Sequence, residues 1–147
     1  PRYDVKYKEY IYRIYNARVR SPFEAQRALF YPYPLTGEKL DAMSHAAGYF
    51  VGRHDFAAFM ASGSDITDTY RTVIKSKIFK VGDIVLYSVS ADGFLYNMVR
   101  IMAGTLLEVA EGKIKPANLP EIIASRDRSR AGRTLPAFGL YLNKVVY

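Results

Sequence analysis

The chain has 147 residues, of which half are hydrophobic and 24% are charged, and this composition excludes an extensively disordered protein. It contains no cysteine, which excludes disulfides, cysteine-based zinc sites and a thiol nucleophile, and its two histidines are too few for a histidine-rich metal site. Twenty-one Lys and Arg against 14 Asp and Glu leave a net charge of +7, which suits a polyanion such as nucleic acid or an anionic membrane surface.

No apolar run approaches the roughly 18 residues that a membrane-spanning helix needs, so we expect no spanning helix. The absence of cysteine fits a cytoplasmic protein, and we expect that location and no membrane partner. The chain begins at Pro1 without an initiator Met and enters a strand-like segment almost at once. This start indicates either a cut inside a longer protein, which we expect, or removal of the initiator Met. We find no internal repeat and no domain boundary, and we expect residues 1–147 to form one domain.

Residues 3–16 (YDVKYKEYIYRIYN) are rich in Tyr, Ile and Val and contain no Gly or Pro, which predicts a long strand. Cations and tyrosines share this segment: Lys6, Lys8, Arg13, Tyr7, Tyr10, Tyr12 and Tyr15. Aromatic rings beside cations can stack on unpaired bases while the cations hold phosphates. The alternative interpretation is a tyrosine-rich structural strand.

The next segment, residues 16–35, contains three prolines, so we expect it to be irregular, and it carries Arg18 and Arg20. Residues 36–52 predict a helix, which Thr36 or Gly37 can cap. Its apolar residues recur at helical spacing: Leu40, Met43, Ala47, Phe50 and Val51. A short helical turn over residues 54–59 and a polar loop over residues 61–68 follow in our prediction.

A β-hairpin is predicted next, over residues 72–81 and 83–91, with Gly82 and Asp83 in the turn. Residues 95–111 then form the clearest helix, and Gly112 can stop it. Its expected buried face consists of Leu95, Met98, Val99, Met102, Leu106, Val109 and Ala110.

The chain closes with a short helix over residues 116–125, a basic loop over residues 126–133 and a strand over residues 138–147. The order strand, helix, hairpin, helix, helix, strand predicts an α+β fold. We expect helices packed on one face of an antiparallel or mixed sheet.

One cation, Arg100, interrupts an apolar stretch in the segment DGFLYNMVRIMAG (residues 92–104). A guanidinium buried among apolar groups is costly unless it meets an anion. Arg100 is therefore either a held partner for a carboxylate or an arginine whose long side chain reaches solvent.

Two further segments have both a functional and a structural interpretation, and a third has a structural one. The loop SRDRSRAGRT carries Arg126, Arg128, Arg130 and Arg133, which can grip phosphates or can simply be solvated. Asp65 and Asp68 are either a weak cation site or solvated loop acids, and solvated acids are the commoner case. In Gly52-Arg53-His54-Asp55 we interpret the aspartate as a capping residue.

In order and spacing, several segments together resemble the tRNA pseudouridine synthase A family. They are KEYIYRIYN (8–16), GRHDFAAF (52–59), TYRTV (69–73), FLYNMVRIMAGTLLEVAEGK (94–113), SRDR and AG (within 125–132) and GLYLNKVVY (139–147). The resemblance spans nearly the whole chain. It implies the pseudouridine synthase α+β fold and conversion of uridine to pseudouridine in the anticodon stem-loop of tRNA. It also implies a homodimer that uses no metal and no organic cofactor.

The resemblance also assigns roles to residues. Tyr10, the first Tyr of KEYIY, matches the active-site tyrosine that packs on the target base. Arg100, in FLYNMVR, matches the arginine that pairs with the nucleophilic aspartate, and Leu140, in GLYL, matches an apolar residue of the base pocket.

The family's nucleophile is the aspartate of a GRTDxGVHA motif, and none of the chain's eight aspartates lies in such a motif. We therefore expect the N-terminal half with the nucleophile to be absent and the chain alone to be inactive. The alternative hypothesis is a stand-alone RNA-binding module without catalysis. The candidate RNA-binding residues are Lys6, Lys8, Arg18, Arg20, Arg126, Arg128, Arg130 and Arg133.

Overall fold

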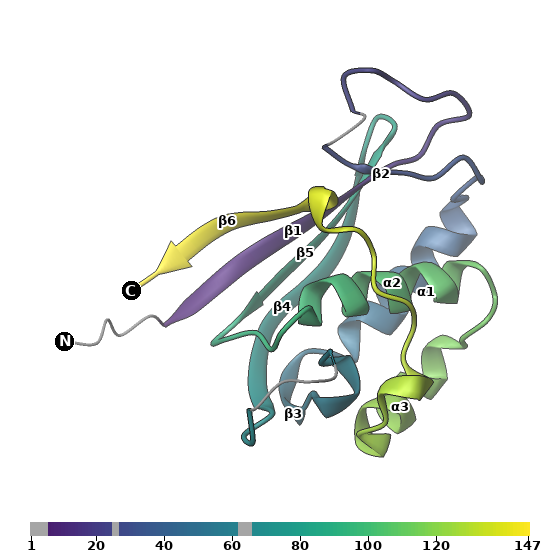
Figure 1. Cartoon of the computed structure of the whole chain (residues 1–147). Helices are drawn as coiled ribbons and strands as arrows, with labels where there is room; N and C mark the ends of the chain where they lie inside the picture. The colour runs from purple at the N-terminus through teal and green to yellow at the C-terminus, as the bar shows by residue number, and fades with distance from the viewer. Residues whose placement is uncertain (1–5, 25–26, 62–65) are drawn as a thin grey trace.

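A six-stranded sheet forms the centre of the computed structural model, which describes residues 6–24, 27–61 and 66–147 (Figure 1). The strands are β1 (Tyr7–Tyr15), β2 (Leu29–Phe30), β3 (Gly52–Asp55), β4 (Tyr70–Val81), β5 (Ile84–Ala91) and β6 (Leu140–Val146). Their order is β2-β1-β5-β4-β3, with β6 also paired to β1. Every pair is antiparallel except β1 with β2, so the mixed sheet that we predicted is confirmed.

The long N-terminal strand and the hairpin are confirmed in their described parts. Strand β1 pairs with β5 along its length and with β6 over most of it, while residues 3–5 of the predicted strand lie outside the described residues. Strands β4 and β5 are joined by Gly82 and Asp83. Gly82 has φ +60, a conformation that glycine adopts without the steric cost of a Cβ.

Three helices pack on one face of this sheet: α1 (Gly37–Gly48), α2 (Met98–Ala110) and α3 (Leu119–Ser125), as Figure 1 shows. The Thr36 hydroxyl accepts a hydrogen bond from the Lys39 amide at 3.3 Å, so Thr36 is the N-cap of α1. Gly112, with φ +80, follows the last turn of α2 and stops it as predicted. None of the helices in the described segments is long and apolar enough to cross a membrane.

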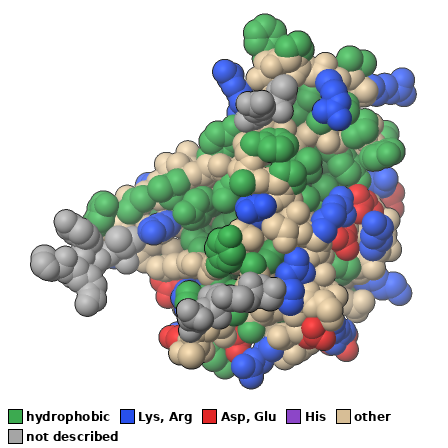
Figure 2. Space-filling view, in the orientation of Figure 1, with side chains coloured by type: hydrophobic (Ala, Val, Ile, Leu, Met, Phe, Trp, Pro, Cys, Tyr) green, Lys and Arg blue, Asp and Glu red, His purple; other side chains and the backbone are tan. Residues whose placement is uncertain are grey.

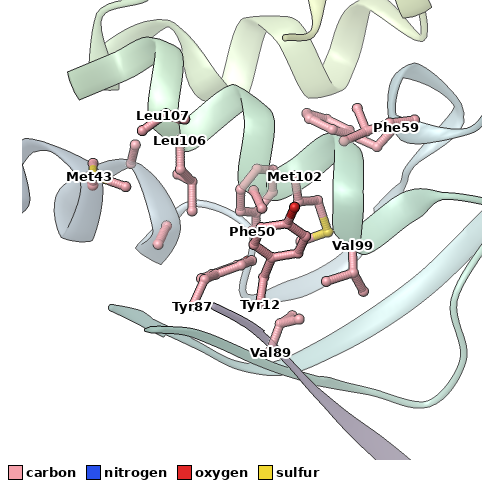
Figure 3. Close-up of a cluster of buried hydrophobic side chains, with 14 of the residues drawn as sticks. Tyr12, Met43, Phe50, Phe59, Tyr87, Val89, Val99, Met102, Leu106 and Leu107 are labelled. Atoms are coloured by element: carbon pink, nitrogen blue, oxygen red, sulfur yellow. The ribbon is translucent and has the colours of Figure 1, made fainter. Parts of the chain in front are cut away.

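The hydrophobic core lies between the sheet and helices α1 and α2 (Figure 3). From the sheet, Tyr12, Tyr87 and Val89 point into it, and all three are fully or almost fully buried. The predicted face of α2 is buried at every position, including Met102 and Leu106, which have no exposed surface. At roughly 25 cal/mol per Å² of apolar surface, this burial is the main force that holds the helices on the sheet.

Two glycines bring α2 into contact with the basic loop of residues 126–133. A Cβ on Gly104 would lie 1.7 Å from the Arg133 carbonyl oxygen, and one on Gly132 would lie 2.6 Å from the Thr105 Cα. The Gly132 amide donates to the Thr105 hydroxyl at 2.9 Å. The backbones of α2 and the loop are therefore in direct contact, at a distance that no side chain larger than hydrogen would allow. This contact places the residues that follow the loop near the start of α2.

Three details of the prediction are wrong. Residues 52–55 form strand β3 instead of ending a helix, because they pair with β4, and the predicted 36–52 helix ends at Gly48. Helix α2 begins at Met98, not at residue 95, because Asn97 has a left-handed backbone with φ 63. The irregular stretch before α1 contains the short strand β2, which pairs with the end of β1.

The sheet face away from the helices carries a buried carboxylate. Glu9 of β1 is only 8% exposed, and its side chain contacts Lys75 at 2.6 Å and Asn143 at 2.6 Å. The register of β1 with β6 shifts next to Glu9, and that of β4 with β5 shifts between Val73 and Lys75. The hydrogen bond from Lys75 holds the pKa of Glu9 below its usual range. Because Glu9 lies on β1 and Lys75 on β4, the same contact links these two strands across the intervening β5.

Candidate active site

Tyr10, Arg100 and Leu140, which come from β1, α2 and β6, line one cavity of about 280 Å³. The remaining lining residues are Phe94, Leu95, Tyr96, Asn97, Met98, Val99 and Ala137. The three residues to which the resemblance assigns roles are thus brought together although they lie far apart in the sequence. A small, mostly apolar cavity with one cation can enclose a planar base and present a charge to it.

Pairing on both sides fixes Tyr10 in the middle of the sheet. It lies opposite Val89 of β5 and Leu142 of β6, and its ring meets Phe94 edge to face at 5.1 Å. Such edge-to-face pairs are a preferred arrangement of aromatic rings. The ring is only partly buried and borders the cavity, so one of its surfaces is open to a ligand.

Leu140 opens strand β6 directly opposite Tyr12. The preceding residue, Gly139, lies against Tyr12 so closely that a Cβ there would be 2.8 Å from the ring carbon Cζ. The Tyr12 hydroxyl donates to the Pro136 carbonyl at 2.6 Å. The glycine of the GLYL motif therefore lets the chain pass over a buried ring and places Leu140 at the cavity.

Two neutral oxygens hold the Arg100 side chain. Its Nε donates to the Leu135 carbonyl at 2.7 Å, and its Nη1 donates to the Asn97 side-chain oxygen at 2.9 Å. The side chain is partly buried and borders the cavity. In the described part of the chain no carboxylate forms an ion pair with Arg100.

Neither Asn97 nor Leu135 was among the predicted site residues. Leu135 contributes only a backbone oxygen and lies 35 residues further along the chain, so no local sequence pattern indicates its contact with Arg100. Asn97 lies three residues before Arg100 in the FLYNMVR segment, and this spacing within the predicted helix, which brings two side chains together, was a signal that could have indicated it.

The arginines of the basic loop all make contacts within the chain. Arg128 donates to the Gly132 carbonyl at 2.8 Å, and Arg133 makes a two-point contact with Glu111 at 2.9 Å for each pair of atoms. Arg126 pairs with Asp55 at 2.9 Å, and Arg130 lies 3.9 Å from Glu121. Arg128 and Arg133 therefore hold the loop together and to α2, while Arg126 and Arg130 keep more of their side chains exposed.

The other candidate RNA-binding residues lie at two separate places. Lys6 and Lys8 are at the start of β1, whereas Arg18 and Arg20 follow its end. Arg18 is exposed, and the Arg20 guanidinium lies 4.6 Å from the centre of the Phe30 ring. In Figure 2, Lys and Arg side chains are spread over the visible face and do not gather in one patch.

A larger cavity, of about 630 Å³, lies at the β3 edge of the sheet and is lined by Arg53, Asp55 and Arg126 among others. The Asp55 carboxylate there accepts hydrogen bonds from the Ala57 amide and the Thr69 hydroxyl and pairs with Arg126. Asp55 is the last residue of β3, and Phe56, not Asp55, has the N-cap position of the short 3-10 helix that follows, so Asp55 contacts the Ala57 amide from one residue before the predicted cap. Its oxygens are occupied by structural partners, so we place the candidate site at the smaller cavity.

Comparison with known proteins shows the family to which the chain is similar. The family model described as tRNA pseudouridine synthase matches residues 46–147, which contain Arg100 and Leu140. The chain belongs to this family. Relatives named tRNA pseudouridine synthase A include one from Caldicellulosiruptor bescii, 44% identical over 146 residues, and one from Acetivibrio thermocellus, 47% identical over 146 residues.

These two pseudouridine synthases each cover 99% of this chain, whereas the chain covers 59% of each of them. A third relative of the same name, from Brevibacillus brevis, is 47% identical with the same coverage. The chain therefore spans about 59% of the length of the curated synthases that it matches. Both the α+β fold and the family that we expected from the sequence are confirmed.

Proposed function

We propose that this chain supplies the base pocket of a tRNA pseudouridine synthase, which converts uridine to pseudouridine in the anticodon stem-loop of tRNA. The observation that carries the proposal is the convergence of Tyr10, Arg100 and Leu140 on one cavity, with Arg100 held by uncharged oxygens. A cation fixed in this way is prepared for a carboxylate. We assign that carboxylate to the nucleophilic aspartate of the family, carried by a part of the protein outside these 147 residues.

The reaction breaks the bond between N1 of uracil and the ribose, turns the base and forms a bond from C5 to the same ribose carbon. One proton leaves C5 and one is taken up at N1, so the product is an isomer of the substrate. No oxidant, reductant or group donor is consumed, and the proposal therefore includes no cofactor and no metal.

Each of the three residues then has a physical task. Arg100 orients the aspartate and favours its ionised form, because a nearby positive charge lowers the pKa of a carboxyl group. The Tyr10 ring packs on the base after it has left the stack of the RNA, and Leu140 closes the pocket. Contact with Tyr10 and Leu140 keeps the detached uracil close to the ribose while the uracil turns.

The whole-chain charge of +7 suits a tRNA substrate, because cations that neutralise phosphates supply affinity that falls with rising salt. We further propose that the full-length protein is a homodimer and works in the cytoplasm, where its tRNA substrate is found. The dimer can be tested by sedimentation of the full-length protein.

Pseudouridine formation in tRNA tests the function. The full-length protein that contains this chain is incubated with unmodified tRNA, and pseudouridine is quantified by mass spectrometry after nuclease digestion, with the 147-residue chain as comparison. We expect product from the full-length protein and none from the chain alone. A folded full-length protein that binds the stem-loop but forms no pseudouridine would contradict the proposal and favour the RNA-binding module.

A further inference from the structure

The helix that carries Arg100 begins in an unusual way. An Asn at the position before a helix usually accepts hydrogen bonds from the first free amides of that helix. Asn97 has this position before α2, but its side chain caps no amide of the helix. Its oxygen instead accepts from Arg100 Nη1 at 2.9 Å.

The backbone of Asn97 explains this direction. Its φ of 63 and ψ of 11 are left-handed, a conformation that Asn tolerates better than most residues with a Cβ. The residue still enters the helix, because its carbonyl accepts from the Ile101 amide at 3.0 Å. The left-handed backbone of Asn97 thus directs its side chain away from the helix amides, while the first backbone hydrogen bond of α2 is still formed.

Asn97 and Leu135 hold the guanidinium from two of its nitrogens. A guanidinium has five N–H donors in one plane. The two contacts use Nε and one N–H of Nη1, so N–H groups remain on both Nη atoms. Leu135 is itself placed by two neighbours: its amide donates to the Arg100 carbonyl at 3.3 Å, and the next carbonyl, that of Pro136, accepts from Tyr12.

We propose that Asn97 is a positioning residue, which fixes the plane of the Arg100 guanidinium so that its free Nη edge faces the catalytic carboxylate. This inference rests on the proposed function of the site. A planar guanidinium that binds a carboxylate through two N–H groups fixes the orientation of that carboxylate. If the plane of the guanidinium rotates, the nucleophilic carboxylate is therefore misoriented as well. The position requires both a left-handed backbone and an uncharged acceptor, and Asn supplies the two together.

Two substitutions in the full-length protein separate positioning from a structural role. Asn97→Gly keeps the left-handed turn without strain but removes the acceptor. Asn97→Asp keeps the acceptor but adds a negative charge that pairs with the guanidinium and competes with the nucleophile. Gly and Asp are both accepted at the start of a helix, so a purely structural role for Asn97 predicts two harmless variants.

We expect kcat for pseudouridine formation to fall by on the order of tenfold to a hundredfold in both variants, since small misplacements at a reacting centre have effects of this size. KM for tRNA and the melting temperature should stay close to those of the unsubstituted protein. Asn118→Gly is the matched control, because Asn118 also precedes a helix and its side chain makes no cap contact. It should leave kcat unchanged.

Each outcome decides the question. An unchanged kcat in Asn97→Gly or Asn97→Asp overturns the inference, and so does a loss of kcat that only follows a loss of folded protein. If the unsubstituted full-length protein forms no pseudouridine, the proposed function fails and this inference fails with it. Product from the unsubstituted protein together with active Asn97 variants rejects the positioning role alone.

Discussion

Arg100 brings a positive charge into surroundings that include Met98, Val99 and Leu135. Two neutral acceptors offset only part of the free energy needed to remove a guanidinium from water. The carboxylate that we propose as the partner of Arg100 supplies the remaining compensation. The same charge opposes the rise in the pKa of Tyr12 that burial causes.

Replacing Arg100 with Ala in the full-length protein should reduce kcat by about a hundredfold or more, because the nucleophilic carboxylate loses its partner. The fold should persist, since Arg100 forms no ion pair with any of the described residues. Single-turnover measurement of pseudouridine gives the effect. Arg53→Ala, at an exposed arginine of the distant strand β3, is the control and should retain the normal rate. Ordinary turnover by the Arg100→Ala protein would refute the role.

Two substitutions distinguish the contribution of the Tyr10 hydroxyl from that of its ring. Tyr10→Phe keeps the edge-to-face contact with Phe94 and the stacking surface, so KM should change little while kcat falls if the hydroxyl helps to move a proton. Tyr10→Ala should raise KM as well, because stacking on a base contributes about 1–3 kcal/mol. Steady-state kinetics with tRNA distinguish the two effects. A Tyr10→Phe protein with the normal kcat would restrict Tyr10 to stacking.

The residues of the site differ in how far the sequence indicates them. Arg100 stands out as a cation within an apolar helix, but only the family resemblance implies an aspartate as its partner. Tyr10 is one of four tyrosines in a single strand, so only the resemblance distinguishes it from Tyr12, which the structure buries completely. Leu135 acts through a carbonyl that every residue has, so its role depends on the fold alone.

Among the elements, α2 and its contact with the basic loop give a prediction about stability. Gly104→Ala should lower the free energy of unfolding by about 1–3 kcal/mol or more, because the new methyl group would overlap the Arg133 carbonyl. Gly48→Ala is the matched control: Gly48 lies at the end of α1, and its added Cβ would meet no atom within 4 Å other than those of neighbouring residues in the helix. This substitution should stabilise the protein by about 0.5–1 kcal/mol. Urea denaturation of the 147-residue chain measures both changes. Equal stability of the two variants would show that the loop adjusts freely.

Whether an element could be predicted depends on where its stabilising contacts come from. The pattern of apolar residues identifies α2, and the turn residues Gly82 and Asp83 identify the hairpin, since both signals are local. Strand β3 is four residues long and is defined by pairing with β4, and β2 has two residues, so neither carries a periodic pattern of its own. The start of α2 was misplaced because its apolar spacing continues through Leu95, before the left-handed turn at Asn97.

At the scale of the molecule, Glu111 connects the end of α2 with two distant segments. Arg133 contacts it at 2.9 Å, and the Tyr31 hydroxyl donates to it at 2.8 Å. The hydrogen bonds from Arg133 are the main reason that the pKa of Glu111 falls from 4.5 to about 2. A carboxyl group with a lowered pKa in the folded state stabilises the fold above pH 4.5, and this contribution is lost as the pH falls towards 2.

Glu111→Gln should therefore lower the free energy of unfolding by about 1 kcal/mol at pH 7, since the contact with Arg133 is partly exposed to solvent. The difference between the variant and the unsubstituted chain should shrink as the pH is lowered from 4.5 to 2. Urea denaturation at several pH values measures it. A difference that does not depend on pH would show that Glu111 acts by packing and not through its charge.

The close contact of Gly104 with Arg133 and of Gly132 with Thr105 also limits how such a protein can evolve. A larger residue at either glycine forces the two backbones apart and displaces Leu135, whose carbonyl holds Arg100. Selection for the proposed activity would then act on two glycines that do not line the candidate cavity. Lineages that lose one glycine should show altered loop lengths nearby, and drift at these sites should be slower than at other glycines, such as Gly48.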